Sequence, residues 1–286
     1  MTKRVKPRVS FVMPAYNRAY IIKSAVQSII NQTRTDWELL IIDDGSTDDT
    51  EAVVRAIGDK RIRYYTQENQ GPAAARNKGV SLAQGKWIAY LDSDNELLPQ
   101  FMDRMLAWLD VHPEAVFAVP RARRTQELYQ DGALVKVIDD SKDTPPGLSL
   151  KDIFMKKQHL DANGFTHLRS LFDDSSIRWD GNLHGLEDWE LALTIGERYP
   201  SGFLYVEEVL YCYHQRFGGD GIVSNSTYSD WAEYFEYIYH KHKHDTMLEG
   251  QSWYPSRIEK WQGLQAQFEA GKLPPYHRYF FEVETT

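Results

Sequence analysis

The stretch GKWIAYLDSDN, residues 85–95, decides the fold of this chain. A glycine leads into an apolar run at residues 87–91, which ends at two carboxylates one residue apart, Asp92 and Asp94. Residues i and i+2 of a strand point to the same side, so both acids can face one spot where the strand ends. Two hard oxygen ligands suit Mg²⁺ or Mn²⁺, which complete their coordination with substrate phosphates. Because turns also favour acids, the pattern gains meaning only from the rest of the chain.

Buried strands and amphipathic helices alternate along the first 120 residues. Short apolar runs predict strands at residues 9–13, 38–42, 61–65, 87–91 and near 115–119. Apolar residues at helical spacing predict helices around 22–30, through 53–57, over 72–83 and over 99–111. Each strand is apolar throughout, which indicates a mainly parallel α/β sheet covered by helices on both faces.

Polar residues gather where these strands end. The first strand runs into residues 14–17, the second into Asp43 and Asp44, and the fourth into Asp92 and Asp94. Parallel α/β sheets bind ligands beyond the carboxyl ends of their strands, so these clusters are expected to open onto one edge. The chain has neither a Gly-x-Gly-x-x-Gly turn nor a Gly-x-x-x-x-Gly-Lys loop. A bound nucleotide would therefore be held by side chains, with a metal at its phosphates.

The alternation loosens in the second half of the chain. Residues 139–147 are polar and proline-rich and predict a long loop, which is either a mobile lid or a surface excursion. Further along, strands are expected over residues 164–169 and 204–213, with a helix over residues 186–199 between them.

The C-terminal part is rich in aromatic residues. Helices are expected over residues 230–242 and 256–270, each with one apolar face. These faces either pack back on the rest of the chain or offer a surface for an acceptor glycan, a second copy of the chain or a membrane. Just before them, the glycine-rich run at residues 218–221 is either a loop that closes over phosphates or a turn.

Composition excludes several classes of protein. A net charge of −8 without a basic stripe argues against a nucleic-acid partner. The single cysteine, Cys212, excludes a disulfide within the chain and fits a reducing compartment. No apolar run approaches the roughly 20 residues of a transmembrane helix, and the basic start at residues 1–8 makes a poor signal peptide. We expect a cytoplasmic protein, with peripheral association at the inner face of a membrane left open.

Five short motifs follow one another along the chain: VMPAYN (12–17), IIDDGSTD (41–48), NQGPAAARN (69–77), AYLDSD (89–94) and EDWEL (187–191). In this order they resemble glycosyltransferase family 2, the inverting, sugar-nucleotide-dependent enzymes of the GT-A fold. The resemblance implies a GT-A-type, Rossmann-like catalytic domain over residues 1–220, with a nucleotide-binding half over about 1–120 and an acceptor-side half over about 121–220. Residues 221–286 would form a helical extension.

The resemblance also implies how a donor would be held. Pro14, Tyr16, Asp43 and Asp44 would hold the base and ribose, with a carboxylate accepting from an N–H like that of uracil. Asn69 and Arg76, at the start of a helix, would help to position the nucleotide. An equally weighted alternative for Arg76 is a solvated arginine on the helix surface.

The metal-binding and catalytic roles are implied in the same way. Asp92 would contact ribose or metal, and Asp94 would bind Mn²⁺ or Mg²⁺ directly, although Asn95 stands where many members have a further aspartate. Asp188 would be the general base, with Glu187 as the competing candidate. Acids in the first turn of a helix are also favoured by the helix dipole alone.

Two histidines near the expected edge are further candidates. His214 follows the strand at residues 204–213 and would be a third metal ligand or a pyrophosphate contact, unless it has a capping or core role. His184, three residues before Glu187, would face the acceptor.

The leading hypothesis is an inverting, metal-dependent glycosyltransferase of the hexosyl or N-acetylhexosaminyl class. It would use a nucleotide-sugar donor, by resemblance a UDP-sugar, and a glycan, glycolipid or other glycoconjugate acceptor. One alternative is a sugar-nucleotide-binding scaffold that has lost catalysis. Another is a nucleotidyltransferase, in which the EDWEL helix would have no evident task. A homo-oligomer formed through the C-terminal helices is also left open.

Overall fold

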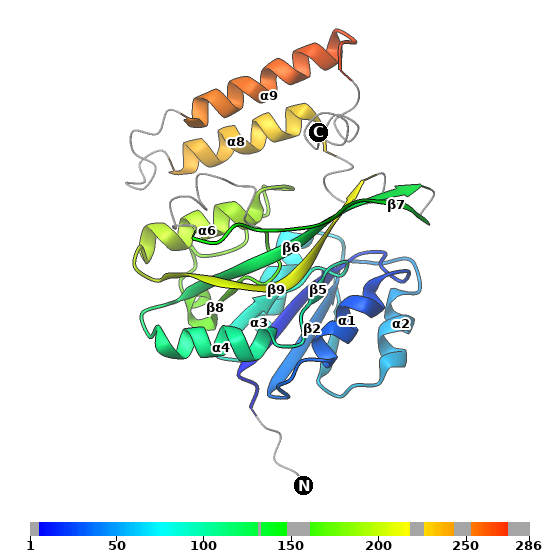
Figure 1. The fold of residues 1–286 in the computed structure, drawn as a ribbon, viewed down its shortest axis with the longest axis vertical. Coiled ribbons are helices and arrows are strands. Elements are labelled where there is room, and N and C mark those ends of the chain that lie inside the picture. The colour runs from blue at the N-terminus through cyan, green and yellow to red at the C-terminus, as the bar shows by residue number, and fades with distance from the viewer. Residues whose placement is uncertain (1–5, 131–132, 148–160, 218–225, 243–252, 274–286) are drawn as a thin grey trace. The chain divides into compact units, whose positions relative to one another are not determined.

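The computed structural model describes residues 6–130, 133–147, 161–217, 226–242 and 253–273 (Figure 1). The chain divides into two compact units. Unit 1 comprises residues 1–124 and 143–213, and unit 2 comprises residues 125–142 and 214–286.

Unit 1 is built on a parallel group of four strands. The strands are β1 (Val9–Ala15), β2 (Trp37–Asp43), β3 (Ile62–Thr66) and β4 (Trp87–Tyr90), in the spatial order β3-β2-β1-β4. In the register, Val9 of β1 lies opposite Trp37 of β2 and Trp87 of β4. All residues of β1, β2 and β4 are buried, as their mainly apolar sequences predict.

Helices cover both faces of this parallel group, as predicted. They are α1 (Ile22–Ile30), α2 (Thr50–Ile57), α3 (Pro72–Leu82) and α4 (Phe101–Val111). Phe11 on one face of β1 belongs to the same core as Ile29 of α1 and Phe101 of α4. On the opposite face, Val12 packs against α3 so closely that a Cβ added at Gly79 would lie 2.4 Å from a Val12 methyl carbon. Helix α3 therefore needs a glycine at its crossing with β1.

Beyond β4 the sheet becomes antiparallel. Strand β8 (Thr166–Leu168) pairs antiparallel with both β4 and β6 (Phe117–Gln130). The order continues through β9 (Phe203–Phe217) to β5 (Glu96–Leu97), which pairs antiparallel with β9. A short 3₁₀ helix, η2 (Arg169–Asp173), follows β8, and α6 (Glu187–Arg198) precedes β9.

The expectation for residues 139–147 is wrong over its first part. Strand β7 (Ala133–Asp143) pairs with β6, so residues 139–143 are strand rather than loop. Similarly, the strand expected near residues 115–119 continues to Gln130. The physical reason is exposure. Residues 134–137 are all exposed, so no buried face imposes the period-two alternation that marks a strand in a sequence.

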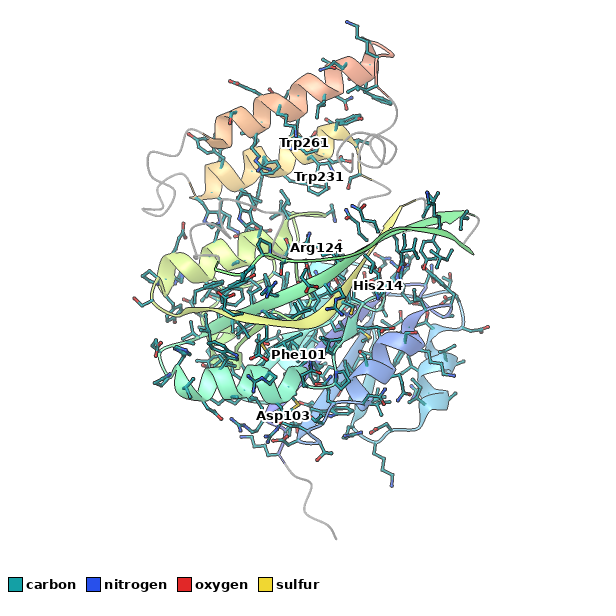
Figure 2. The ribbon with its side chains drawn as sticks, viewed as in Figure 1. Phe101, Asp103, Arg124, His214, Trp231 and Trp261 are labelled. Atoms are coloured by element: carbon teal, nitrogen blue, oxygen red, sulfur yellow. The ribbon has the colours of Figure 1, made fainter. Side chains whose placement is uncertain are left out.

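Unit 2 contains the predicted pair of C-terminal helices, α8 (Tyr228–His242) and α9 (Trp253–Glu269). The two helices pack on each other: the rings of Trp231 and Trp261 stack with centroids 6.0 Å apart (Figure 2), and those of Tyr228 and Phe268 lie 5.8 Å apart. Among the described residues, no helix combines the length and the apolar character that a membrane crossing needs. The unit also holds residues 125–142, which the expected boundary near residue 220 assigned to the catalytic domain. The glycine-rich run at residues 218–221 lies outside the described residues.

Candidate functional site

The end of β2 places two buried acids side by side, and the first of them is Asp43. One of its carboxylate oxygens accepts a hydrogen bond from the Ser46 amide at 2.8 Å, and the other accepts from the Tyr64 hydroxyl of β3. Burial, followed by this contact with Asp43, raises the pKa of Tyr64, so the phenol stays protonated. Asp43 is thus held as an oriented, hydrogen-bonded carboxylate.

The second acid, Asp44, fixes the loop between β3 and α3. Its Oδ1 accepts from the Gln67 side chain at 2.7 Å and from the Gln70 amide at 3.0 Å, and its Oδ2 accepts from the Gly71 amide at 2.7 Å. This loop carries the predicted nucleotide contact Asn69, which is exposed. Both oxygens of Asp44 therefore hold the chain that presents Asn69.

The end of β1 supplies Pro14, which is buried, and Tyr16, which is 45% exposed. Next to them, Asn17 adopts a left-handed conformation with φ of 52°. Its amide donates to the Ser46 hydroxyl and its side-chain oxygen accepts from the Thr47 amide, both at 2.8 Å. The motifs at residues 12–17 and 41–48 are thereby joined into one surface, with the Tyr16 ring exposed on it.

The end of β4 presents Asp92 and Asp94, as predicted. Asp92 accepts from Arg76 Nη2 at 2.8 Å and from Asn163 Nδ2 at 3.1 Å, while its own amide donates to Asn163 Oδ1 at 2.7 Å. Asp94 is partly buried, and its Oδ1 accepts from Asn95 Nδ2 at 3.0 Å. Protein donors therefore occupy both oxygens of Asp92.

Arg76 connects the end of β4 to the start of α6. Its Nη1 donates to Glu187 Oε1 at 3.0 Å, while its Nη2 holds Asp92. The side chain is only 4% exposed. Burial opposes its charge, but the carboxylates of Asp92 and Glu187 outweigh that effect and raise the pKa of Arg76. The alternative of a solvated helix arginine is therefore wrong.

Helix α6 carries both candidates for the general base in its first turn. Leu186, the residue before the helix, has a left-handed backbone with φ of 68°. Glu187 is buried against Arg76, whereas Asp188 is partly exposed and its Oδ1 accepts from the Trp189 amide at 2.7 Å. The more accessible of the two is the residue that the resemblance implies as base.

The two histidine candidates lie in different surroundings. His214 belongs to unit 2, where its Nδ1 lies 2.8 Å from Glu127 Oε1 and 3.0 Å from Thr125 Oγ1 (Figure 2). The hydrogen bond with His214 lowers the pKa of the Glu127 carboxyl, and this effect outweighs burial, which acts in the opposite direction. His184 is exposed, and a Cβ added at Gly71 would lie 3.9 Å from its Nδ1. The structure thus brings His184 into contact distance of the loop at residues 67–71.

A divalent cation fits this site only with help from a substrate. Within the described residues, no three or more His, Cys, Asp or Glu side chains are grouped so as to hold a metal. Asp94, with Asp92 beside it, offers the one or two carboxylates that Mg²⁺ or Mn²⁺ takes when phosphate oxygens complete its coordination. The residues present are compatible with such a cation, and the role of His214 as a third ligand stays a prediction.

Three residues of the site were assigned no role from the sequence. Asn163 binds Asp92 Oδ2, whereas Arg76 binds Oδ1. The ring of Trp179 covers Arg76, with the guanidinium carbon 4.6 Å from the ring centroid, and Asn77 binds the Trp179 backbone. Asn163 and Trp179 belong to none of the five motifs. Only the aromatic residue shortly before EDWEL could have served as a signal.

Fold and site together define a class. A parallel group of strands extended by antiparallel strands, with acids at the strand ends and without a glycine-rich phosphate loop, is the GT-A-type α/β fold. The family model described as Glycosyl transferase family 2 matches residues 10–172, more than half of the chain. The chain belongs to glycosyltransferase family 2.

Individual relatives match different shares of the chain. The succinoglycan biosynthesis protein ExoO of Rhizobium meliloti (strain 1021) is 31% identical over 217 residues, 70% of this chain and 60% of that protein. The Escherichia coli protein WfgD, named UDP-Glc:alpha-D-GlcNAc-diphosphoundecaprenol beta-1,3-glucosyltransferase, is 43% identical over 88 residues, 30% of this chain and 35% of that one. The chain thus spans less than two thirds of the length of either relative.

A solved structure resembles nearly the whole chain. The crystal structure of S. aureus TarS 1–349 in complex with UDP-GlcNAc matches with a TM-score of 0.65, covering 98% of this chain and 73% of that one. Sequence identity is 17%, so this likeness concerns the fold.

Proposed function

We propose that this chain is an inverting, metal-dependent glycosyltransferase. It moves a sugar from a nucleotide-diphosphate donor, a UDP-sugar, to a hydroxyl group of a glycan, glycolipid or other glycoconjugate. The observation that carries the proposal is the double contact of Arg76. One guanidinium holds both Asp92, at the end of a parallel strand, and Glu187, the neighbour of Asp188. Donor-side and base-side acids therefore meet at one edge of the sheet.

The donor lies across the ends of β1 and β2 in this proposal. The Asp43 carboxylate, oriented by Tyr64 and Ser46, accepts the N–H of a uracil ring, and Tyr16 offers an exposed aromatic face beside it. Support for a uridine nucleotide comes from TarS, whose structure contains UDP-GlcNAc, and from WfgD, whose name specifies UDP-Glc.

Asp94, with Asp92 beside it, holds the divalent cation in this proposal. The cation, when bound, neutralises the negative charge that develops on the diphosphate as it leaves. Arg76 and Asn163 keep Asp92 in place on the donor side, so the protein contributes an ordered edge rather than a complete cage of ligands.

Asp188 acts as the general base. It removes the proton of the acceptor hydroxyl as that oxygen bonds to the anomeric carbon and the bond from this carbon to the phosphate oxygen breaks. A single displacement of this kind inverts the anomeric centre. The name of WfgD supports inversion, because a UDP-Glc donor with an α linkage gives the β product that the name states.

Calorimetric titration of the purified chain with UDP, GDP and dTDP, each with Mn²⁺ and with EDTA, tests the donor site. We expect UDP to bind in the presence of Mn²⁺ and to lose affinity in EDTA. Asp94→Asn should remove that metal dependence, whereas Asp110→Asn, at an exposed acid of α4 paired with Arg8, should not. If a folded sample binds none of the three nucleotides under either condition, the proposed donor site is wrong.

A further inference from the structure

We propose that Arg76 is a positioning residue that sets the separation between the donor-side acid and the base helix, and that it does not bind the nucleotide. Trp179, held in place by Asn77, is the second part of this device. The inference rests on the proposed function, because the two groups that Arg76 joins are the ends of the proposed donor and base sites.

The first step is that the Arg76 side chain already forms ion pairs within the protein. Both terminal nitrogens form ion pairs, at 3.0 Å to Glu187 and 2.8 Å to Asp92, and the residue is 3% exposed. Glu187 itself is 5% exposed. A phosphate or ribose that approached the guanidinium would have to compete with these two carboxylates for its terminal nitrogens. Leaving the buried carboxylate of Glu187 without its partner would be strongly unfavourable.

The second step is that the ring of Trp179 covers the guanidinium. The guanidinium carbon lies 4.6 Å from the ring centroid, a distance at which a cation is attracted to the aromatic face. Tyr90 of β4 packs edge-on against the same indole, with centroids 4.9 Å apart. Trp179 therefore contacts both β4, the strand that leads to Asp92, and the guanidinium that binds Asp92.

The third step is the clamp that Asn77 places on Trp179. The Asn77 side chain donates to the Trp179 carbonyl at 2.9 Å and accepts from the Trp179 amide at 3.0 Å. A side-chain amide that satisfies both backbone groups of one residue acts as a strand partner would, and it joins positions 102 residues apart. Consecutive residues of α3 thus hold Trp179 by its backbone and by its ring.

Together these contacts tie three segments to one another: α3, the end of β4 and the first turn of α6. A guanidinium is planar and presents its donors in a fixed fork, so the two carboxylates that it binds have a defined separation. A lysine would supply the charge but not the fork. Because Asp188 follows Glu187 directly, the position of the proposed base depends on this fork.

The test compares Arg76→Lys with Arg63→Lys in the full chain. Arg63 is a matched control, since it also pairs with a buried acid, Glu38, at 2.8 Å, but lies on β3. The readouts are the affinity for UDP with Mn²⁺ by calorimetry, and kcat and KM for UDP release from UDP-Glc and UDP-GlcNAc with water as acceptor. We expect Arg76→Lys to keep UDP affinity within about threefold and to lower kcat about 100-fold, the effect of a misplacement of about 1 Å. Arg63→Lys should change neither.

Trp179→Leu provides a second variant that leaves both ion pairs in place. We expect it to lower kcat by about tenfold without lowering the affinity for UDP. The effects of Trp179→Leu and Arg76→Lys on kcat should be non-additive, since both residues position the same groups. A loss of UDP affinity above tenfold in Arg76→Lys, with kcat preserved, would mean that Arg76 binds the nucleotide and would overturn the inference. If the wild-type chain itself fails to bind UDP, the proposed function fails, and the inference fails with it.

Discussion

At the scale of single residues, several acids of the site are already hydrogen-bonded within the protein. Asp43, Asp44 and Asp92 each have protein donors on both carboxylate oxygens. The sequence predicted where these acids lie, because strand ends in a parallel sheet share an edge. It could not predict how they are engaged, because all their partners except Ser46 belong to segments 16 to 71 residues away, Tyr64 and Asn163 among them.

Tyr64→Phe tests the orientation of Asp43. The change removes one hydrogen bond to a carboxylate, which is worth roughly 1.5–3 kcal/mol, so we expect UDP affinity to fall by about tenfold or more with kcat little changed. Calorimetry with UDP and Mn²⁺ measures the loss. Tyr65→Phe is the control, because its hydroxyl bonds Arg63 instead. Equal UDP affinity in the wild type and Tyr64→Phe would argue against base recognition by Asp43.

Asp188→Asn tests the general base. The amide keeps the size of the carboxylate but cannot take up the proton, so we expect kcat to fall by a factor of about 10²–10⁴. Affinity for UDP with Mn²⁺ should stay within about threefold. Glu197→Gln, an exposed change in the last turn of the same helix, controls for loss of charge on α6. Turnover that survives in Asp188→Asn would point to Glu187 as the base. A wild-type chain that binds UDP but does not release it from UDP-sugars would favour the scaffold alternative.

At the scale of elements, the parallel half of the sheet could be predicted and the ribbon of β6 and β7 could not. Strands β1, β2 and β4 are buried on both sides, so hydrophobicity alone marks them. In contrast, β7 exposes residues 134–137, and its order comes from backbone pairing with β6, which leaves little trace in side-chain type. Helices were predicted to within a few residues because most of them carry apolar residues at helical spacing; α6, which is buried over most of its length, is the exception.

Gly79→Ala tests the close crossing of α3 and β1. The added methyl would lie 2.4 Å from a Val12 side-chain carbon, and overpacking of a core costs about 1–3 kcal/mol. We expect lower resistance to urea, with partial recovery in the double variant Gly79→Ala with Val12→Ala. Gly263→Ala in α9 meets no atom within 4 Å and should raise stability by roughly 0.5–1 kcal/mol through helix propensity. If both alanines stabilise the chain equally, the crossing is looser than described.

At the scale of the whole molecule, the chain divides differently from the expectation of a boundary near residue 220. The division falls between Tyr213 and His214, and residues 125–142 belong with the C-terminal helices. The cause lies in β6 and β9, which are 14 and 15 residues long and run from one unit into the other. A sequence shows a change of composition, but it does not show a strand that serves two units.

The stability of the chain should depend on pH through His167. Burial lowers the pKa of this histidine from 6.5 to about 4 in the fold, where its Nε2 lies 2.8 Å from the Tyr90 hydroxyl. Below pH 6.5 the unfolded chain binds a proton that the folded chain excludes, so stability is full above pH 6.5 and decreases as the pH falls towards 4. The shift corresponds to roughly 3 kcal/mol.

Urea unfolding at steps between pH 7 and 4.5 measures this dependence, with His167→Gln as the comparison. Glutamine retains hydrogen bonding but does not titrate, so the slope of unfolding free energy against pH should become shallower by about one proton. The difference between the two slopes removes the contributions of the carboxyl groups that both chains share. These include Asp161, because burial raises the pKa of this carboxyl. Identical slopes would contradict a neutral, buried His167.

Asp44 has a consequence for the thermodynamics of ligand binding. Its three hydrogen bonds order the loop that carries Asn69 before any ligand arrives, so the loss of chain entropy accompanies folding rather than association. A donor nucleotide would meet a preorganised loop, and more of its contact energy would remain as affinity. The amide protons of Gln70 and Gly71, bonded to a buried carboxylate, should accordingly exchange slowly with solvent even though neither residue lies in a helix or strand.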